Sequence, residues 1–152
     1  MAAYTDSIGF NKGTAAYPAN ISEFLSRFEV TLNFAEIVAA RAAAGATALA
    51  ATDTLQIIPL PAGSVVLSAG VNVITAETTN TTATFDLGFT GGSPAAANAY
   101  ANDVASNSTG LKAADLANPT VVAAADTIDL LLNTAAPANC VVKVFALVLS
   151  TN

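Results

Sequence analysis

The sequence predicts an all-β protein: a single antiparallel β-sandwich or jelly roll preceded by an extended N-terminal arm. Three observations carry this prediction. Apolar and polar residues alternate in several short segments, turn residues separate those segments, and no long run keeps the 3.6-residue period of a helix. A chain of 152 residues is most simply one domain with its own core. We therefore expect an arm over 1–26 and a sandwich over 27–152.

The uncharged stretch inside Asp53–Glu77 organises the predicted sandwich. Its apolar residues predict two strands around a tight reversal. Pro59 and Pro61 mark the end of the first strand, because proline cannot donate to a ladder, and Gly63 supplies the positive φ that a turn favours. The prolines, glycines and β-branched residues favour strands over a membrane helix, so we expect a β-hairpin and no membrane span.

The clearest alternation lies in residues 27–38 and predicts a half-buried antiparallel strand. The Ala-rich residues that follow, 39–52, leave two interpretations open. One is a short helix over 36–44 with Gly45 at its C-terminal cap, and the other is an extended loop.

The C-terminal half holds three further predicted strands, over 83–89, 126–132 and 141–150. The last is apolar on both faces except for Lys143, which is typical of a central strand or of one covered by a neighbour. Residues 91–118 are small and polar with no strand period, so they predict a long loop. We expect this loop to make contacts through Tyr100 and Leu111.

The arm, residues 1–26, sustains neither a strand period nor a helix period. It spaces four aromatic residues among Gly, Pro, Asn and Ser, and lone aromatic side chains can anchor a segment in pockets. These are Tyr4, Phe10, Tyr17 and Phe24. We expect the arm to be disordered in the free protein and to become ordered across a neighbour in an assembly, with Phe10 and Tyr17 as central anchors. The alternative is a frayed terminus.

The composition is unusual for a free monomer. Charged residues make up 11% of the chain, about half the usual share for a soluble domain, so the surface must consist largely of Ala, Thr, Ser, Asn and Gly. Such a surface favours a protein covered by copies of itself or by a larger assembly. A secreted β domain with a neutral surface is the alternative, although residues 1–10 lack the pattern of a secretory signal.

Charge argues against two classes of partner. The net charge is −6, and the five basic residues form no cluster along the sequence. Nucleic-acid binding needs a basic stripe, and an anionic membrane surface attracts basic segments. We therefore expect neither nucleic acid nor a membrane among the partners.

The sequence holds no convincing catalytic constellation. The absence of histidine removes the commonest general base and metal ligand. Cys140, the only cysteine, stands beside two valines, which favours a buried structural residue over a reactive thiol. Asp126 and Asp129 point to opposite faces of a strand. We assign no catalytic, cofactor-binding or metal residue and expect no enzyme. Calcium binding by loop carboxylates stays open, although the spacing of a calcium loop is missing.

Several segments nevertheless resemble a known group of proteins. They are LPAGSVVLSAG (60–70), ATFDLG (83–88), AADTIDL (124–130) and VVKVFALV (141–148). Together they are similar to small virion structural proteins of tailed bacteriophages of marine and freshwater bacteria, including cyanobacteria. The resemblance covers roughly residues 28–150, and its motifs are strands and turns rather than catalytic signatures.

The resemblance implies a non-enzymatic, β-rich protein on the outer surface of a capsid. The function it favours is that of a decoration or cement protein that bridges subunits of the major capsid protein. By analogy with decoration proteins at local threefold positions, we expect a homotrimer. Two alternatives stay open: a tail or fibre component of the virion, and a secreted carbohydrate-binding β-sandwich.

Overall fold

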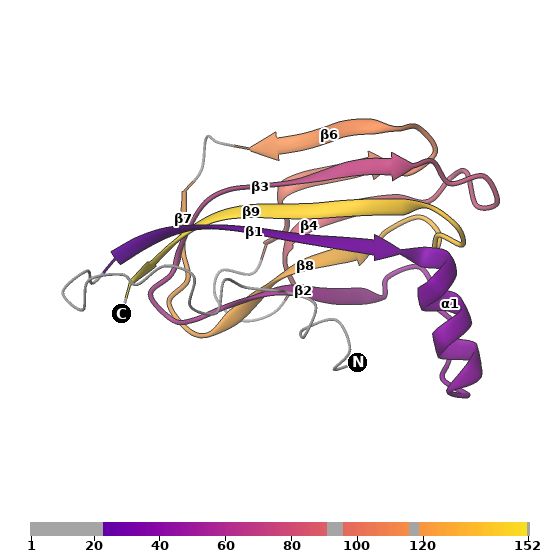
Figure 1. Ribbon diagram of the computed structural model, residues 1–152, viewed down its shortest axis with the longest axis horizontal. Helices are drawn as coiled ribbons and strands as arrows, with labels where there is room; N and C mark the ends of the chain where they lie inside the picture. Colours follow the sequence, from indigo (N-terminus) through magenta and orange to yellow (C-terminus); the bar gives the residue numbers. More distant parts are fainter. Residues whose placement is uncertain (1–22, 91–95, 116–118, 152) are drawn as a thin grey trace.

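Strands form wherever apolar residues recur at every second position, because this period places them all on one face of a sheet. The computed structural model describes residues 23–90, 96–115 and 119–151. Figure 1 shows the elements in chain order, which are β1 (Glu23–Asn33), α1 (Phe34–Ala43), β2 (Thr54–Leu60), β3 (Val65–Thr75), β4 (Thr84–Phe89), β5 (Ala96–Ala105), β6 (Gly110–Asp115), β7 (Thr120–Val121), β8 (Asp126–Leu132) and β9 (Val141–Thr151).

The strands form two antiparallel sheets. Sheet A has the order β1-β9-β3-β6, with β7 also paired to β3, and sheet B has the order β2-β8-β4-β5. The pairs are nested, since β1 pairs with β9, β2 with β8, β3 with β6 and β7, and β4 with β5. A ribbon of nested antiparallel pairs that is rolled into two sheets is a jelly roll. The predicted fold class is therefore confirmed.

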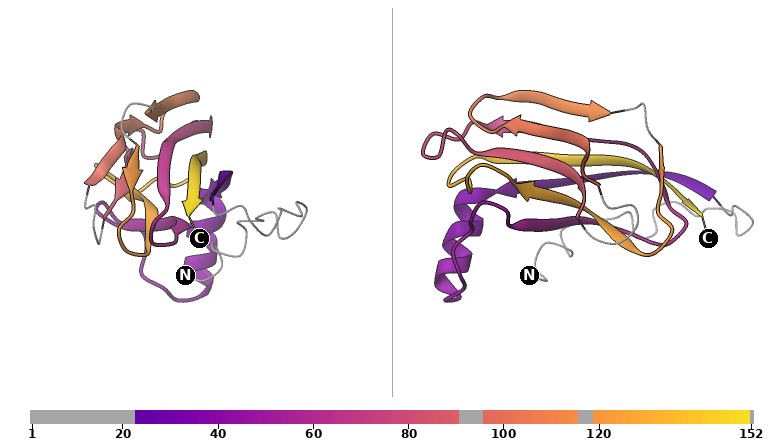
Figure 2. Two further views of the ribbon diagram at one scale, coloured as in Figure 1. Left: turned by 90° about the vertical axis from the view of Figure 1, so that its left-hand side faces the viewer. Right: turned by 180° about the vertical axis from the view of Figure 1, so that it is seen from behind.

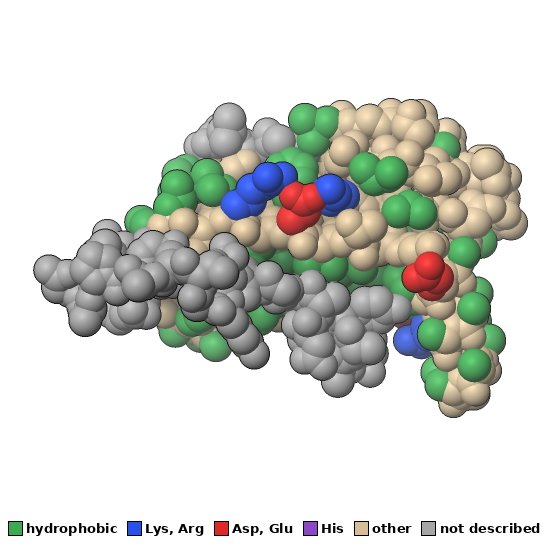
Figure 3. Space-filling view, in the orientation of Figure 1, with side chains coloured by type: hydrophobic (Ala, Val, Ile, Leu, Met, Phe, Trp, Pro, Cys, Tyr) green, Lys and Arg blue, Asp and Glu red, His purple; other side chains and the backbone are tan. Residues whose placement is uncertain are grey.

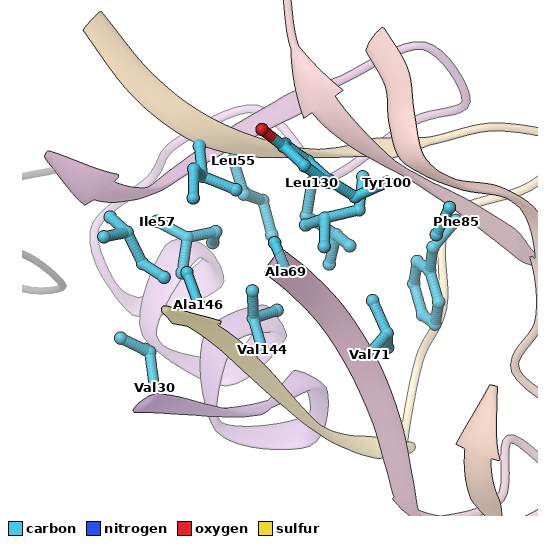
Figure 4. Packing of buried hydrophobic residues seen from close by; sticks show 14 of the residues in the cluster. Val30, Leu55, Ile57, Ala69, Val71, Phe85, Tyr100, Leu130, Val144 and Ala146 are labelled. Atoms are coloured by element: carbon cyan, nitrogen blue, oxygen red, sulfur yellow. The ribbon is translucent and has the colours of Figure 1, made fainter. Parts of the chain in front are cut away.

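The core lies between the two sheets, and both contribute to it. Figure 4 shows Val71 of sheet A close to Phe85 of sheet B, and Ala146 of sheet A close to Ile57 of sheet B. Two aromatic pairs add to the packing: Phe34 stacks on Phe85 with ring centroids 5.7 Å apart, and Phe89 meets Tyr100 edge to face at 5.8 Å. The alternation along each strand thus serves one continuous apolar layer.

The predicted hairpin within Asp53–Glu77 is wrong in its pairing. Both strands and the turn form, and Gly63 has the expected positive φ of 84°. However, β2 belongs to sheet B and β3 to sheet A, so the turn is a corner between sheets. The sequence showed where the chain reverses but not which strands pair, because β2 finds its partner in β8 and β3 finds its partners in β9, β6 and β7.

The long loop predicted over 91–118 is also wrong. Strands β5 and β6 occupy most of this segment and lie side by side where the two sheets meet, as the view from behind in Figure 2 shows. Their Ala and Asn residues are poor strand formers by composition, so tertiary pairing with β4 and β3 decides their conformation.

The first strand begins earlier than expected. Residues 23–26, assigned to the arm, belong to β1 and pair with the last residues of β9, while residues 1–22 lie outside the described part of the chain. At its other end, β1 stops at Asn33 and α1 takes over. The helical alternative for the Ala-rich segment is confirmed, and Gly45 follows the helix with a φ of 63°.

Helix α1 and the loop after it project from one end of the sandwich (Figure 1). Only Phe34 and Ile37 of the helix are buried. Arg41 donates from Nε and Nη2 to the Thr47 carbonyl, at 2.9 and 2.6 Å, and so ties the loop back to the helix. These hydrogen bonds therefore hold the projecting loop against the helix, although the helix contributes only two buried residues to the core.

Glu77 joins the loops at the end of the sandwich where α1 emerges. It is only 2% exposed, and its carboxylate accepts five backbone N–H groups. Two come from its own loop, from Thr79 and Asn80, and three come from residues 138–140 before β9. Burial alone would raise the pKa of Glu77, but the N–H donors outweigh it and lower the pKa to about 2.

Gly88 shows how tightly β4 and β5 approach each other. Their register shifts between Leu87↔Ala101 and Phe89↔Ala96, so β5 carries extra residues there. A Cβ on Gly88 would meet the Ala96 carbonyl oxygen and would lie 2.7 Å from Ala97 C and from Ala99 N. These are backbone atoms, so no side-chain rotation can make room.

We predict that Gly88→Ala destabilises the protein by about 3 kcal/mol or more, because β5 must move away from β4. The matched control is Gly45→Ala, where an added Cβ meets nothing within 4 Å and only the positive φ opposes the substitution, at a cost of about 1 kcal/mol. Urea unfolding of both variants measures the difference. Equal losses in the two variants would contradict the close approach at Gly88.

We predict that Glu77→Gln lowers the free energy of unfolding at pH 7 by about 2–4 kcal/mol, because the amide nitrogen faces N–H donors and cannot accept from them. The folded-state pKa of Glu77 is below its ordinary value of 4.5. The stabilisation is therefore complete above about pH 4.5 and declines as the pH falls toward 2. Urea titrations at pH 7 and pH 3 should show the gap between wild type and variant narrowing in acid, and exposed Glu36→Gln is the control. A gap that stays constant with pH would refute this account of Glu77.

Candidate interaction surface

The outward side chains of β9 are mostly apolar, where a solvated strand would present polar ones. Along β9, the inward residues Val142, Val144, Ala146 and Val148 are buried. The residues between them point outward and are also mostly apolar, and all are partly buried: Val141, Lys143, Phe145, Leu147 and Leu149. Because β9 lies between β1 and β3, this second apolar face runs along the middle of the sheet. The predicted central position of this strand is confirmed.

Four outward side chains form one row across sheet A, which we call the end row. The register pairs Leu25 with Leu149, Leu149 with Val65, and Val65 with Val121. Directly paired residues share a face, so the row crosses four strands without a polar member. Its two ends are the most open, since Leu25 is 54% exposed and Val121 is 61% exposed.

The charges of this face gather in one trio. Glu29 on β1 forms ion pairs with Arg27 and with Lys143 across the β1–β9 pair. The hydrogen bond from Lys143 and the nearby Arg27 lower the pKa of Glu29, although burial opposes them. Figure 3 shows charged side chains gathered over β1 and β9, with apolar side chains and other atoms of the protein around them. Exposed ion pairs of this kind contribute little to the free energy of unfolding. The trio therefore affects the charge distribution on the surface more than the stability of the fold.

The outer face of sheet B is different in character. Its strands carry four aspartates and no Lys or Arg. The protein itself binds several of these carboxylates: Asp129 accepts from Thr127 and Thr90, and Asp86 accepts from the Asp103 backbone N–H at 2.7 Å. The two faces of the sandwich therefore differ. Sheet A presents an apolar strip with a trio of charges, whereas of the four aspartates of sheet B only Asp103 is exposed.

The structure places the residues proposed as contact anchors in different environments. Tyr4, Phe10 and Tyr17 lie outside the described residues. Phe24 belongs to β1 by its backbone pairing with Ser150. Leu111 lies on β6 and is exposed, whereas Tyr100 is buried against Phe89 in the core. Tyr100 thus serves packing in this structure, and its proposed role at the surface is corrected.

Sequence reasoning missed the end row. The signal for it was present in part, since the two apolar faces of β9 were noted. Its other members come from β1, β3 and β7, and only the register brings them into line. No local pattern reveals that alignment.

Catalytic chemistry finds little support among the described residues. Cys140 is buried, and burial together with the adjacent negative Glu77 raises the pKa of its thiol to about 12. Within 23–90, 96–115 and 119–151, no three Cys, Asp or Glu residues gather in a way that could hold a metal ion. No helix in this part of the chain is long and apolar enough to cross a membrane.

The comparisons with known proteins identify solved structures of similar fold but no protein family. No protein-family model matches the chain, and no curated protein matches it in sequence. Among solved structures, the chain is similar to one in the capsid asymmetric unit of cyanophage Pam1, with 15% identity, a TM-score of 0.59 and coverage of 91% of this chain and 92% of that one. It is also similar to one in the acidic stable capsid structure of Helicobacter pylori bacteriophage KHP30, with 11% identity, a TM-score of 0.53 and coverage of 86% and 89%. At these identities the similarity is one of fold.

Proposed function

We propose that this protein is a structural component of a bacteriophage virion, and specifically a capsid decoration or cement protein that bridges subunits of the major capsid protein on the outer surface of the capsid. The observation that carries the proposal is the apolar strip on the outer face of sheet A, formed by the outward residues of β9 and by the end row. A jelly roll buries its core between its sheets, so a second apolar face serves contacts outside the chain.

Two further observations support the virion role. The sequence motifs of the strands and turns resemble those of small virion structural proteins, and the fold is similar to chains in two phage capsid structures. The described residues also offer no reactive thiol and no metal cluster. A chain with a large share of its sequence in strands and few charged residues suits an assembly.

The asymmetry of the two faces favours a fixed orientation in that assembly. The outer face of sheet A carries an apolar strip, formed by the outward residues of β9 and by the end row, beside the Arg27–Glu29–Lys143 trio. The outer face of sheet B carries aspartates without basic partners on its strands. We infer that sheet A faces protein, because its apolar strip is stabilised when it is covered. Sheet B then faces water, where exposed Asp103 keeps its hydration.

A carbohydrate-binding module is the candidate from another class. Such a module binds sugars with exposed, coplanar aromatic rings. Among the aromatic side chains that the structure describes, Phe145 alone is partly exposed, and the others are buried. A glycan array that gave specific binding in the micromolar range would favour this alternative over a virion component.

We predict that the protein lies on the head of the phage particle. Gold-labelled antibodies raised against the purified protein should mark the capsid in electron micrographs of particles from the native source. Labels confined to the tail or its fibres would replace the decoration role with the tail alternative. Particles that carry no label at all would contradict a virion role.

We predict that the purified protein self-associates, because association covers the apolar strip of sheet A. By analogy with decoration proteins at local threefold positions, we expect a homotrimer. Sedimentation velocity at micromolar concentration should show a species with three times the 15.1 kDa chain mass. A stable monomer under these conditions would contradict self-association, and a stable dimer would contradict the threefold arrangement.

A further inference from the structure

The end row lies at the end of sheet A where the described chain begins. Strand β1 starts at Glu23, only two residues before Leu25. The middle of the row, Leu149 and Val65, is partly buried by its neighbours, while Leu25 and Val121 stay more than half exposed in the isolated chain. Single exposed apolar residues are common on proteins, but four in register on adjacent strands form a continuous apolar strip.

The segment that precedes β1, residues 1–22, is also poor in charge and rich in large apolar residues. Residues 1–22 carry only two charges, Asp6 and Lys12. They also contain six large apolar or aromatic residues, Met1, Tyr4, Ile8, Phe10, Tyr17 and Ile21. Fully extended, the segment spans up to about 75 Å, whereas the eleven residues of β1 span about 36 Å. It is therefore long enough to reach the same row on an adjacent copy.

We propose that the end row is the seat for residues 1–22 of a second copy of this chain. The isolated chain leaves both ends of its row exposed, and it offers a segment of suitable composition and reach at the same end of the sheet. Exchange of this segment between copies covers each row with a neighbour's aromatic side chains. The inference rests on the proposed function only in that it needs the copies to assemble.

The Arg27–Glu29–Lys143 trio limits how far this seat extends along β1. Two residues along β1 from Leu25 stands Arg27, which is paired with Leu147 in register and bound to Glu29. The uncharged strip ends there, so the seat has space for a few anchoring side chains rather than for the whole segment. Tyr17 and Phe10, the nearest and the next aromatic residues before β1 within residues 1–22, are the anchors that the seat would take.

Cysteine cross-linking of full-length chains tests the exchange. One chain carries Ala16→Cys, next to Tyr17, and the other carries Val121→Cys in the row. Buried Cys140 stays out of the reaction because its thiol is protonated at neutral pH. After mild oxidation of the mixture we expect a disulfide between the two chains at a yield at least tenfold above that of a control pair, in which Asn102→Cys on the outer face of sheet B replaces Val121→Cys.

A yield no higher than that of the control pair would overturn the proposal. So would a chain carrying both cysteines that closes its disulfide internally at every dilution, since the segment would then cover its own row. If the cross-link fails while antibodies still label the capsid, only this inference is lost. If particles carry no label and the protein is a monomer, the proposed function is lost as well.

Substitutions in the row provide a second readout. Leu25→Asp and Val121→Asp should each weaken self-association at least tenfold without changing the thermal unfolding midpoint of the monomer, because both side chains are exposed. Ile74→Asp is the matched control, since Ile74 is 47% exposed near the opposite end of β3 and should change association less than twofold. Equal effects of all three substitutions would contradict a specific seat at the end row.

Discussion

The position of β9 between β1 and β3 is the constraint on which the rest of the structure depends. The last strand of the chain pairs with the first over eleven residues and with β3 on its other side. Its inward valines close the core, and its outward residues form the centre of the apolar outer face. The nested pairing of a jelly roll imposes this arrangement, since the two ends of the rolled ribbon must meet. Core and surface thus depend on a single strand.

The ends of the sandwich are fixed by polar contacts rather than by apolar burial. Glu77 holds its own loop and the segment before β9 through backbone N–H groups, and it stays ionised in the folded state down to about pH 2. A buried carboxylate is stable only when such donors replace water. Because this segment leads directly into β9, the same contacts help to set where the central strand starts.

Sequence reasoning succeeded where the physics is local. Alternation predicted most strands, and Gly63 and Gly45 took the positive φ that their turns need. It failed where distant pairing decides. The segment that holds β5 and β6 looked like a loop, because Ala and Asn favour strands only when a neighbour pairs with them. The end row could not be predicted for the same reason, because its members are aligned only by the registers of the β1–β9, β3–β9 and β3–β7 pairs.

The central claim is that the apolar strip on the outer face of sheet A meets other protein subunits while the outer face of sheet B meets water. A near-atomic reconstruction of phage particles from the native source tests it most directly. The account predicts that Phe145, Leu147 and the end row lie in contact with neighbouring subunits and that Asp103 lies toward solvent. A map in which the outer face of sheet A is bare and sheet B forms the contacts would contradict it.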